Sequence, residues 1–82
     1  MNILYQYYNE IVLKFSDYET DFQVGVIFIF VPEDKKPFDI VCEKINTQLQ
    51  RIADTLDLRD KDIVIRIVRG AQFSELKFEK QV

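Results

Sequence analysis

The fold of this chain is decided by residues 22–37, which read FQVGVIFIFVPEDKKP. The first ten of these residues are β-branched or aromatic apart from Gln23 and Gly25, a composition typical of a buried strand. Two prolines close this strand, and Pro37 suits the first position of a helix because its missing N–H costs nothing there. We therefore expect one central strand over 22–31, covered on both faces, with a bulge or a close approach at Gly25.

The residues after this stretch predict a strand–helix–strand unit followed by a hairpin. Apolar residues recur every three or four positions from Pro37 to about Leu56, which predicts an amphipathic helix. A second strand is expected over 63–68, parallel to the first. Gly70 with the next residue suits a two-residue type II′ turn. An antiparallel edge strand over 72–80, rich in charge, then completes the sheet.

Residues 2–15 precede the central strand and carry apolar side chains at helical spacing. A strand is the alternative, since Ile11, Leu13 and Phe15 alternate, but it leaves the earlier spacing unexplained. We interpret 2–15 as a first helix and the polar residues 16–21 as a connector.

The predicted fold is a single small α+β domain over 1–82, in the order helix, strand, helix, strand, strand, with a mixed three-stranded sheet. The second helix covers one face of this sheet. The first helix, or a second copy of the protein, is needed on the other face. The side chains that require this cover are Ile27, Ile29, Val31, Val64 and Val68.

Composition narrows the classes of function. The chain has 82 residues and is 48% hydrophobic, with 14 acidic and 11 basic residues and a net charge of −3, which fits a folded protein and disfavours nucleic acid as a partner. The longest apolar run is far shorter than the roughly 20 residues of a membrane span. A single cysteine excludes an internal disulfide, and we expect a cytoplasmic protein without a secretory leader.

Most catalytic residue types are missing. The chain contains no histidine, so a Cys/His zinc site is excluded and the usual catalytic base is absent. Asp57, Asp60 and Asp62 lack the glycine and glutamate of a calcium loop, and we interpret them as a solvated turn. Cys42 lies on the apolar side of the second helix and is expected to be an inert core thiol with a raised pKa. We therefore expect neither an enzyme nor a bound cofactor or metal.

Two groups of residues are candidates for binding. The first helix has a broad apolar side rich in tyrosine, which favours a protein interface. Its candidate residues are Tyr5, Tyr8, Val12 and Leu13. The alternative is a surface for single-stranded nucleic acid on the C-terminal hairpin, where basic residues flank Phe73 and Phe78. Its candidate residues are Arg66, Arg69, Lys77 and Lys80, although Glu75 and Glu79 are interleaved with them.

The expected function is therefore binding to another protein, together with self-association into a homo-oligomer. Ten isoleucines against two alanines and two glycines are typical of AT-rich genomes, including those of many phages. On that basis we expect an inhibitor, an immunity-type protein or a regulator of a mobile element.

Overall fold

The computed structural model describes residues 3–23, 25–56 and 62–78. These residues form two helices and a four-stranded sheet in one α+β unit. The elements in chain order are α1 (Ile3–Lys14), β1 (Glu19–Gln23), β2 (Val26–Phe30), α2 (Phe38–Thr55), β3 (Ile63–Arg69) and β4 (Gln72–Phe78).

The sheet has the strand order β1-β2-β3-β4. β2 and β3 are parallel and joined through α2, and β3 and β4 form an antiparallel hairpin, so the predicted strand–helix–strand unit and C-terminal hairpin are both confirmed. Gly70 has a φ of +56°, the left-handed conformation that the predicted turn requires. α1 is a helix, which excludes the alternative strand over its last residues.

The prediction of a single strand over 22–31 is wrong, because two antiparallel strands occupy this region. β1 begins at Glu19, within the residues predicted to be a connector, and Gln23 pairs with Val26 across a tight turn. Gly25 adopts a φ of +78° there, and a Cβ at this position would meet no atom within 4 Å. Gly25 therefore serves to turn the chain, and neither a bulge nor a close approach explains it.

The turn also changes which residues share a face. A continuous strand would put Phe22 on the same face as Phe28, but the reversal pairs Phe22 with Ile27 and places it against the core. The sheet thus has four strands, and its order in the chain is helix, two strands, helix, two strands.

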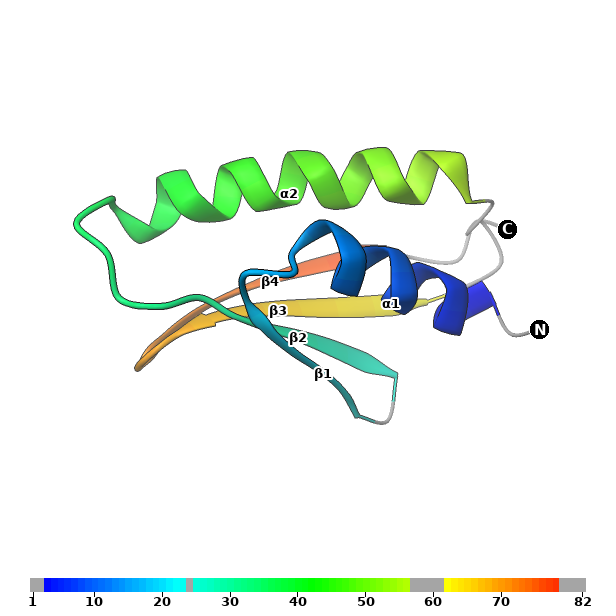
Figure 1. Ribbon diagram of the computed structural model, residues 1–82, viewed down its shortest axis with the longest axis horizontal. Helices are drawn as coiled ribbons and strands as arrows, with labels where there is room; N and C mark the ends of the chain where they lie inside the picture. The colour runs from blue at the N-terminus through cyan, green and yellow to red at the C-terminus, as the bar shows by residue number, and fades with distance from the viewer. Residues whose placement is uncertain (1–2, 24, 57–61, 79–82) are drawn as a thin grey trace.

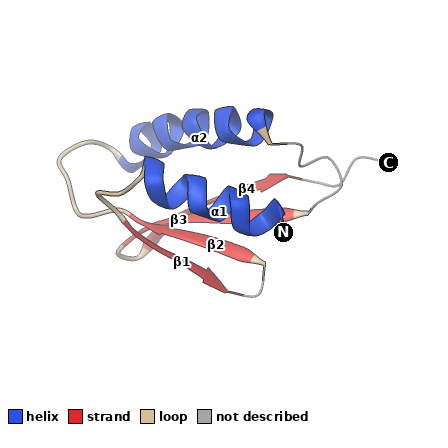
Figure 2. Ribbon diagram, turned by 45° about the vertical axis from the view of Figure 1, so that its right-hand side comes forward, coloured by secondary structure: helices blue, strands red, loops and turns tan. Residues whose placement is uncertain are grey.

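Both helices lie on the same face of the sheet (Figures 1 and 2). Tyr7 of α1 donates a hydrogen bond of 3.1 Å to the carbonyl of Leu49 in α2, and its ring meets Phe78 of β4 edge-on. Of the two covers that the sequence leaves open for the second face, α1 is therefore excluded. Ile27, Ile29 and Val31 are buried under the helices, whereas Val64 and Val68 point to the other face.

The core lies between the helices and this covered face. Its sheet side consists of isoleucines in register, with Ile27 beside Ile65 and Ile29 beside Ile67. The helices contribute fully buried Tyr7, Ile11 and Leu49 among others. The structure is consequently a two-layer arrangement in which one sheet face has no layer above it.

Candidate binding surface

The uncovered side of the sheet, here called the open face, carries a continuous group of apolar side chains. Parallel register places Val26 beside Val64 and Phe30 beside Val68, and the C-terminal hairpin brings Phe73 next to Val68. Each of these side chains is at least partly exposed. The group, here called the apolar band, consists of Val26, Phe28, Phe30, Val64, Val68 and Phe73.

Alternation along β2 produces the apolar band. The odd-numbered residues Ile27 and Ile29 point into the core. The even-numbered residues of β2 therefore point to the open face; these are Val26, Phe28 and Phe30. The rings of Phe28 and Phe30 stack with centroids 6.0 Å apart. Phe30 is 38% exposed and Phe73 is 63% exposed, so two large rings face solvent on this side. Patches of this kind on a folded domain mark interaction sites.

Charged side chains lie on the outer strands β1 and β4 of the open face, and one, Arg66 of the inner strand β3, lies between Val64 and Val68 within the apolar band. On β1, Glu19 and Asp21 share the open face, since they pair with Phe30 and Phe28. Towards the opposite edge, Arg66 forms an ion pair of 2.8 Å with Glu75, and Lys77 lies 3.7 Å from the same carboxylate. The β1 edge is thus acidic, while β3 and β4 carry two cations and one carboxylate.

The predicted nucleic-acid residues do not form one surface. Arg66 and Lys77 lie on the open face, but both contact Glu75, and the Arg66 guanidinium also stacks 5.7 Å from the Phe73 ring centroid. Arg69 is buried on the opposite face under the helices. Lys80 and Glu79 lie outside the described residues. The acidic neighbours and the separation of Arg69 weaken the case for a phosphate-binding surface.

The predicted helix residues are placed on α1, away from the apolar band. Tyr5 and Leu13 are exposed, by 57% and 73%, and Val12 is less exposed, by 37%. Tyr8 is partly buried, because its ring packs edge-on against Phe22 and its hydroxyl lies 3.5 Å from Thr20 Oγ1. Tyr5 also stacks on Phe22, with ring centroids 5.6 Å apart. These tyrosines therefore attach α1 to β1.

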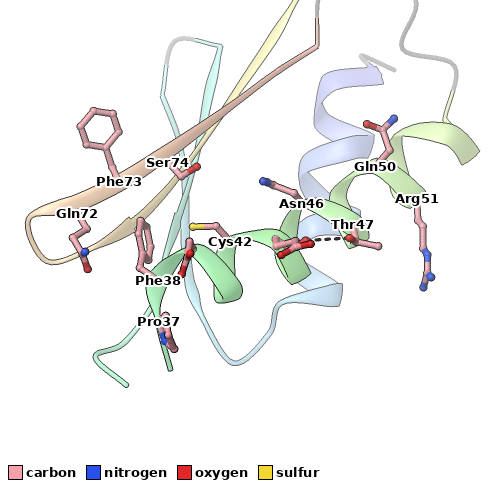
Figure 3. A pocket seen from close by; sticks show the side chains of 12 residues that line it. Pro37, Phe38, Cys42, Asn46, Thr47, Gln50, Arg51, Gln72, Phe73 and Ser74 are labelled. Carbon is pink, nitrogen blue, oxygen red and sulfur yellow. Dashed lines mark hydrogen bonds between the residues drawn. The ribbon is translucent and has the colours of Figure 1, made fainter. Parts of the chain in front are cut away.

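A broad groove of about 970 Å³ separates α2 from β4 (Figure 3). Phe38 and Cys42 extend from α2 towards β4, where Ser74 lies. Burial raises the pKa of the Cys42 thiol, opposed by a hydrogen bond with Ser74 and the charge of Arg69. This direction agrees with the raised pKa that the sequence predicts for Cys42, and a raised pKa lowers the fraction of thiolate, the reactive form.

Within the part of the chain that is described, no three Cys, Asp or Glu side chains are grouped as metal ligands would be. Asp57 and Asp60 lie outside that part. No helix among the same residues has the length and apolarity needed to cross a bilayer.

Comparison of the chain with protein-family models, with curated proteins and with solved structures gives no match. The geometry of the molecule therefore carries the functional proposal by itself.

The apolar band was not singled out by sequence reasoning, although the signal was present. Because the sequence-based assignment places Ile27, Ile29 and Val31 on the face away from the helix over 37–56, it leaves Phe28 and Phe30 under that helix. The structure has the opposite arrangement, with the three aliphatic side chains buried under the helices. The pairing of β2 with β3 then adds Val64 and Val68 to the side that carries Phe28 and Phe30.

Proposed function

We propose that this protein is a non-enzymatic, protein-binding regulator whose binding surface is the open face of its sheet. The observation that carries this proposal is the apolar band, which neither helix covers. Exposed phenylalanine rings such as Phe30 and Phe73 are costly to leave in water and valuable when a partner buries them. Binding of this kind works stoichiometrically and needs none of the catalytic residue types that the chain lacks.

The first occupant that we propose for the open face is a second copy of the same chain. Four strands about 4.8 Å apart make the face about 19 Å wide and about 20 Å long, similar to one sheet of a β-sandwich. Two such faces packed together would bury both apolar bands. The product is a four-layer dimer with helices outside and two sheets inside.

Charge complementarity favours this arrangement. A two-fold axis parallel to the strands places β1 of one copy over β4 of the other. Asp21 then lies over Glu75 of the second copy, whose carboxylate is paired with Arg66 and Lys77, so the acidic β1 edge faces a half of the sheet with a net positive charge. The facing halves of the two sheets thus carry net charges of opposite sign, which favours this orientation of the copies.

The oligomeric state tests the proposal. Light scattering coupled to size-exclusion chromatography is expected to give a dimer mass for the wild type. Phe73→Lys and Phe30→Lys should each give a monomer, because an ammonium group in the centre of the interface must be desolvated. Circular dichroism verifies that both variants stay folded, as expected for side chains that do not enter the core.

Leu13→Lys is the matched control, since Leu13 is an exposed apolar side chain on α1, away from the open face. We expect this variant to remain a dimer. A wild type that is monomeric over the whole concentration range would overturn the proposed occupant. Dissociation by Leu13→Lys alone would move the interface to α1, in line with the sequence-based hypothesis for Tyr5, Tyr8, Val12 and Leu13.

A further inference from the structure

β4 forms one edge of the sheet, and no strand lies beside its outer side among the described residues. Its backbone hydrogen bonds in that part of the chain all go to β3. β4 also lacks the devices that usually block an edge, since it contains no proline and its charged side chains Glu75 and Lys77 pair with each other on the open face. A row of free backbone N–H and C=O groups is a template for a further strand.

The opposite edge of the sheet, β1, is less available. The carboxylate of Asp21 accepts a hydrogen bond of 2.9 Å from the backbone N–H of Phe22, so one main-chain donor of this edge strand is already paired. The ring of Phe22 is also held by Tyr5 and Tyr8 of α1. Strand addition is therefore favoured at β4.

α2 covers β3 fully but covers β4 only in part. The alternate isoleucines of β3 that face the helices are at most 1% exposed. Their partners on β4 face the same way, yet each is partly exposed; these are Ser74, Leu76 and Phe78. The groove of about 970 Å³ lies on this side, between α2 and the start of β4 (Figure 3). The layer of cover over the sheet thus stops short of the β4 edge.

The groove has the length of a short strand. Its α2 wall runs from Pro37 to Arg51, which is about 20 Å of helix at 1.5 Å per residue. An extended segment spans this distance with about six residues, close to the length of β4. A strand bonded to β4 would direct every second side chain between β4 and α2. In this mode of recognition, main-chain hydrogen bonds give affinity and the alternate side chains give specificity.

The charges of α2 define the side chains that fit the groove. Asp39 and Glu43 line it one helical turn apart, and both are exposed and without a counter-charge among the described residues. The third charged residue of the lining, Arg51, points away from β4 (Figure 3). Phe38 and Cys42 supply apolar surface beside the two carboxylates. A lysine or arginine suits this combination, because its stem packs on apolar surface while its cation reaches the carboxylates.

We propose that the β4 edge binds an extended basic segment of another protein, which adds a fifth strand and directs alternate lysine or arginine side chains into the groove beside Asp39 and Glu43. This site does not rest on the dimer through the open face, because packing of two sheets face to face leaves their edges free.

The test uses the peptide acetyl-Lys-Val-Lys-Val-Lys-Val-amide as the probe. Isothermal titration calorimetry is expected to show saturable binding of one peptide per chain. Acetyl-Glu-Val-Glu-Val-Glu-Val-amide has the same pattern with the opposite charge, and should bind at least about tenfold more weakly. Hydrogen exchange followed by NMR should show that the basic peptide protects every second backbone amide of β4, because only alternate N–H groups point to the outer side of a strand.

Two N-methylated versions of the basic peptide test strand addition itself. One carries the methyl groups on the backbone nitrogens of its lysines, the other on those of its valines. Only one of these two sets of N–H groups faces β4 in an added strand. One version should therefore lose binding while the other keeps it.

Glu43→Lys should weaken binding of the basic peptide about tenfold, because a cation replaces one of the two carboxylates. Glu10→Lys is the matched control, since it makes the same change of charge at an exposed position of α1 and should leave the affinity unchanged. Phe30→Lys removes the proposed dimer and should still bind the peptide, because Phe30 lies on β2. Failure of the dimer and failure of this site are thus distinguishable.

Three results would overturn the proposal. The first is the absence of saturable binding of the basic peptide. The second is equal binding of the basic and acidic peptides, or of both N-methylated versions, since charge or strand addition would then play no part. The third is protection of the β4 amides in Phe30→Lys that grows with protein concentration when no peptide is present, because a second copy of the chain would then occupy the edge.

Discussion

Tyr7 shows how a single side chain holds both layers of this small protein together. Its ring is fully buried against the core and Phe78, while its hydroxyl donates to the Leu49 carbonyl of the neighbouring helix. The hydrogen bond satisfies the one polar atom of the side chain, which makes burial of so large a residue favourable.

Tyr7 predicts a pH dependence of stability. Burial raises the pKa of the Tyr7 phenol above its ordinary value of about 10. Above that pH the unfolded chain loses this proton while the folded protein keeps it, so the free energy of unfolding must fall as the pH rises. Tyr7→Phe removes this contribution, and should cost about 0.5–1.5 kcal/mol at neutral pH through loss of the hydrogen bond.

Urea unfolding of both proteins at about pH 8 and about pH 11 measures the effect. Burial also raises the pKa of Cys42, but this thiol is present in both proteins and its contribution cancels in the comparison. The wild type should lose more stability than Tyr7→Phe between the two pH values. Equal losses would contradict the assigned role of Tyr7.

Arg69 illustrates the limit of a charge-based assignment at the residue scale. Its charge placed it in a hypothetical nucleic-acid patch, yet it continues the parity of Ile63, Ile65 and Ile67 and is buried with them. Alternation along the strand was the better guide to its position. The same alternation correctly leaves Arg66 exposed.

At the scale of elements, the β1–β2 hairpin depends on the conformation of Gly25. A φ of +78° is costly for a residue with a side chain, by about 1–2 kcal/mol, even where space is open. We therefore expect Gly25→Ala to lower the free energy of unfolding by about that amount. Gly25→Asn should cost less, because asparagine tolerates the left-handed region better than alanine does.

Urea denaturation of the two variants measures this difference. The order wild type, then asparagine, then alanine is expected. Equal stability of Gly25→Ala and the wild type would contradict a turn that requires a positive φ.

Sequence patterns predicted most elements because each carries a local signal. The three-and-four spacing defined α1 and α2, and Gly70 marked the turn of the β3–β4 hairpin. The sequence patterns did not predict the β1–β2 hairpin, because apolar residues continue on both sides of Gly25 and the β1 residues Glu19 to Asp21 are polar. β1 is an edge strand, and its polar side chains on the open face resemble those of a loop.

The face that a helix covers is a non-local property. The apolar spacing of α1 shows that it packs, but the same spacing suits either side of a sheet. The contacts of Tyr7 with Leu49 and Phe78 place α1 on the same face of the sheet as α2. The open face, and with it the candidate site, therefore depends on tertiary contacts that periodicity does not encode.

At the scale of the whole molecule, the proposed dimer predicts that thermal stability depends on protein concentration. When unfolding is coupled to dissociation, a hundredfold rise in concentration should raise Tm by roughly 5 °C. Phe73→Lys should show no such dependence, whereas Leu13→Lys should keep it. Differential scanning fluorimetry across this range of concentration gives the answer, and a constant wild-type Tm would argue against the dimer.

The charges that border the apolar band allow a test of how the two copies are oriented. If β1 of one copy lies over β4 of the other, Lys77→Glu makes the net charge of the half that faces Glu19 and Asp21 negative and should weaken the dimer about tenfold. Adding Asp21→Lys to the same chain restores opposite charges, so the double variant should recover most of the lost affinity. Sedimentation equilibrium measures both dissociation constants. Recovery would support the two-fold axis parallel to the strands. Additive weakening in the double variant would rule it out, because the two side chains would then act independently.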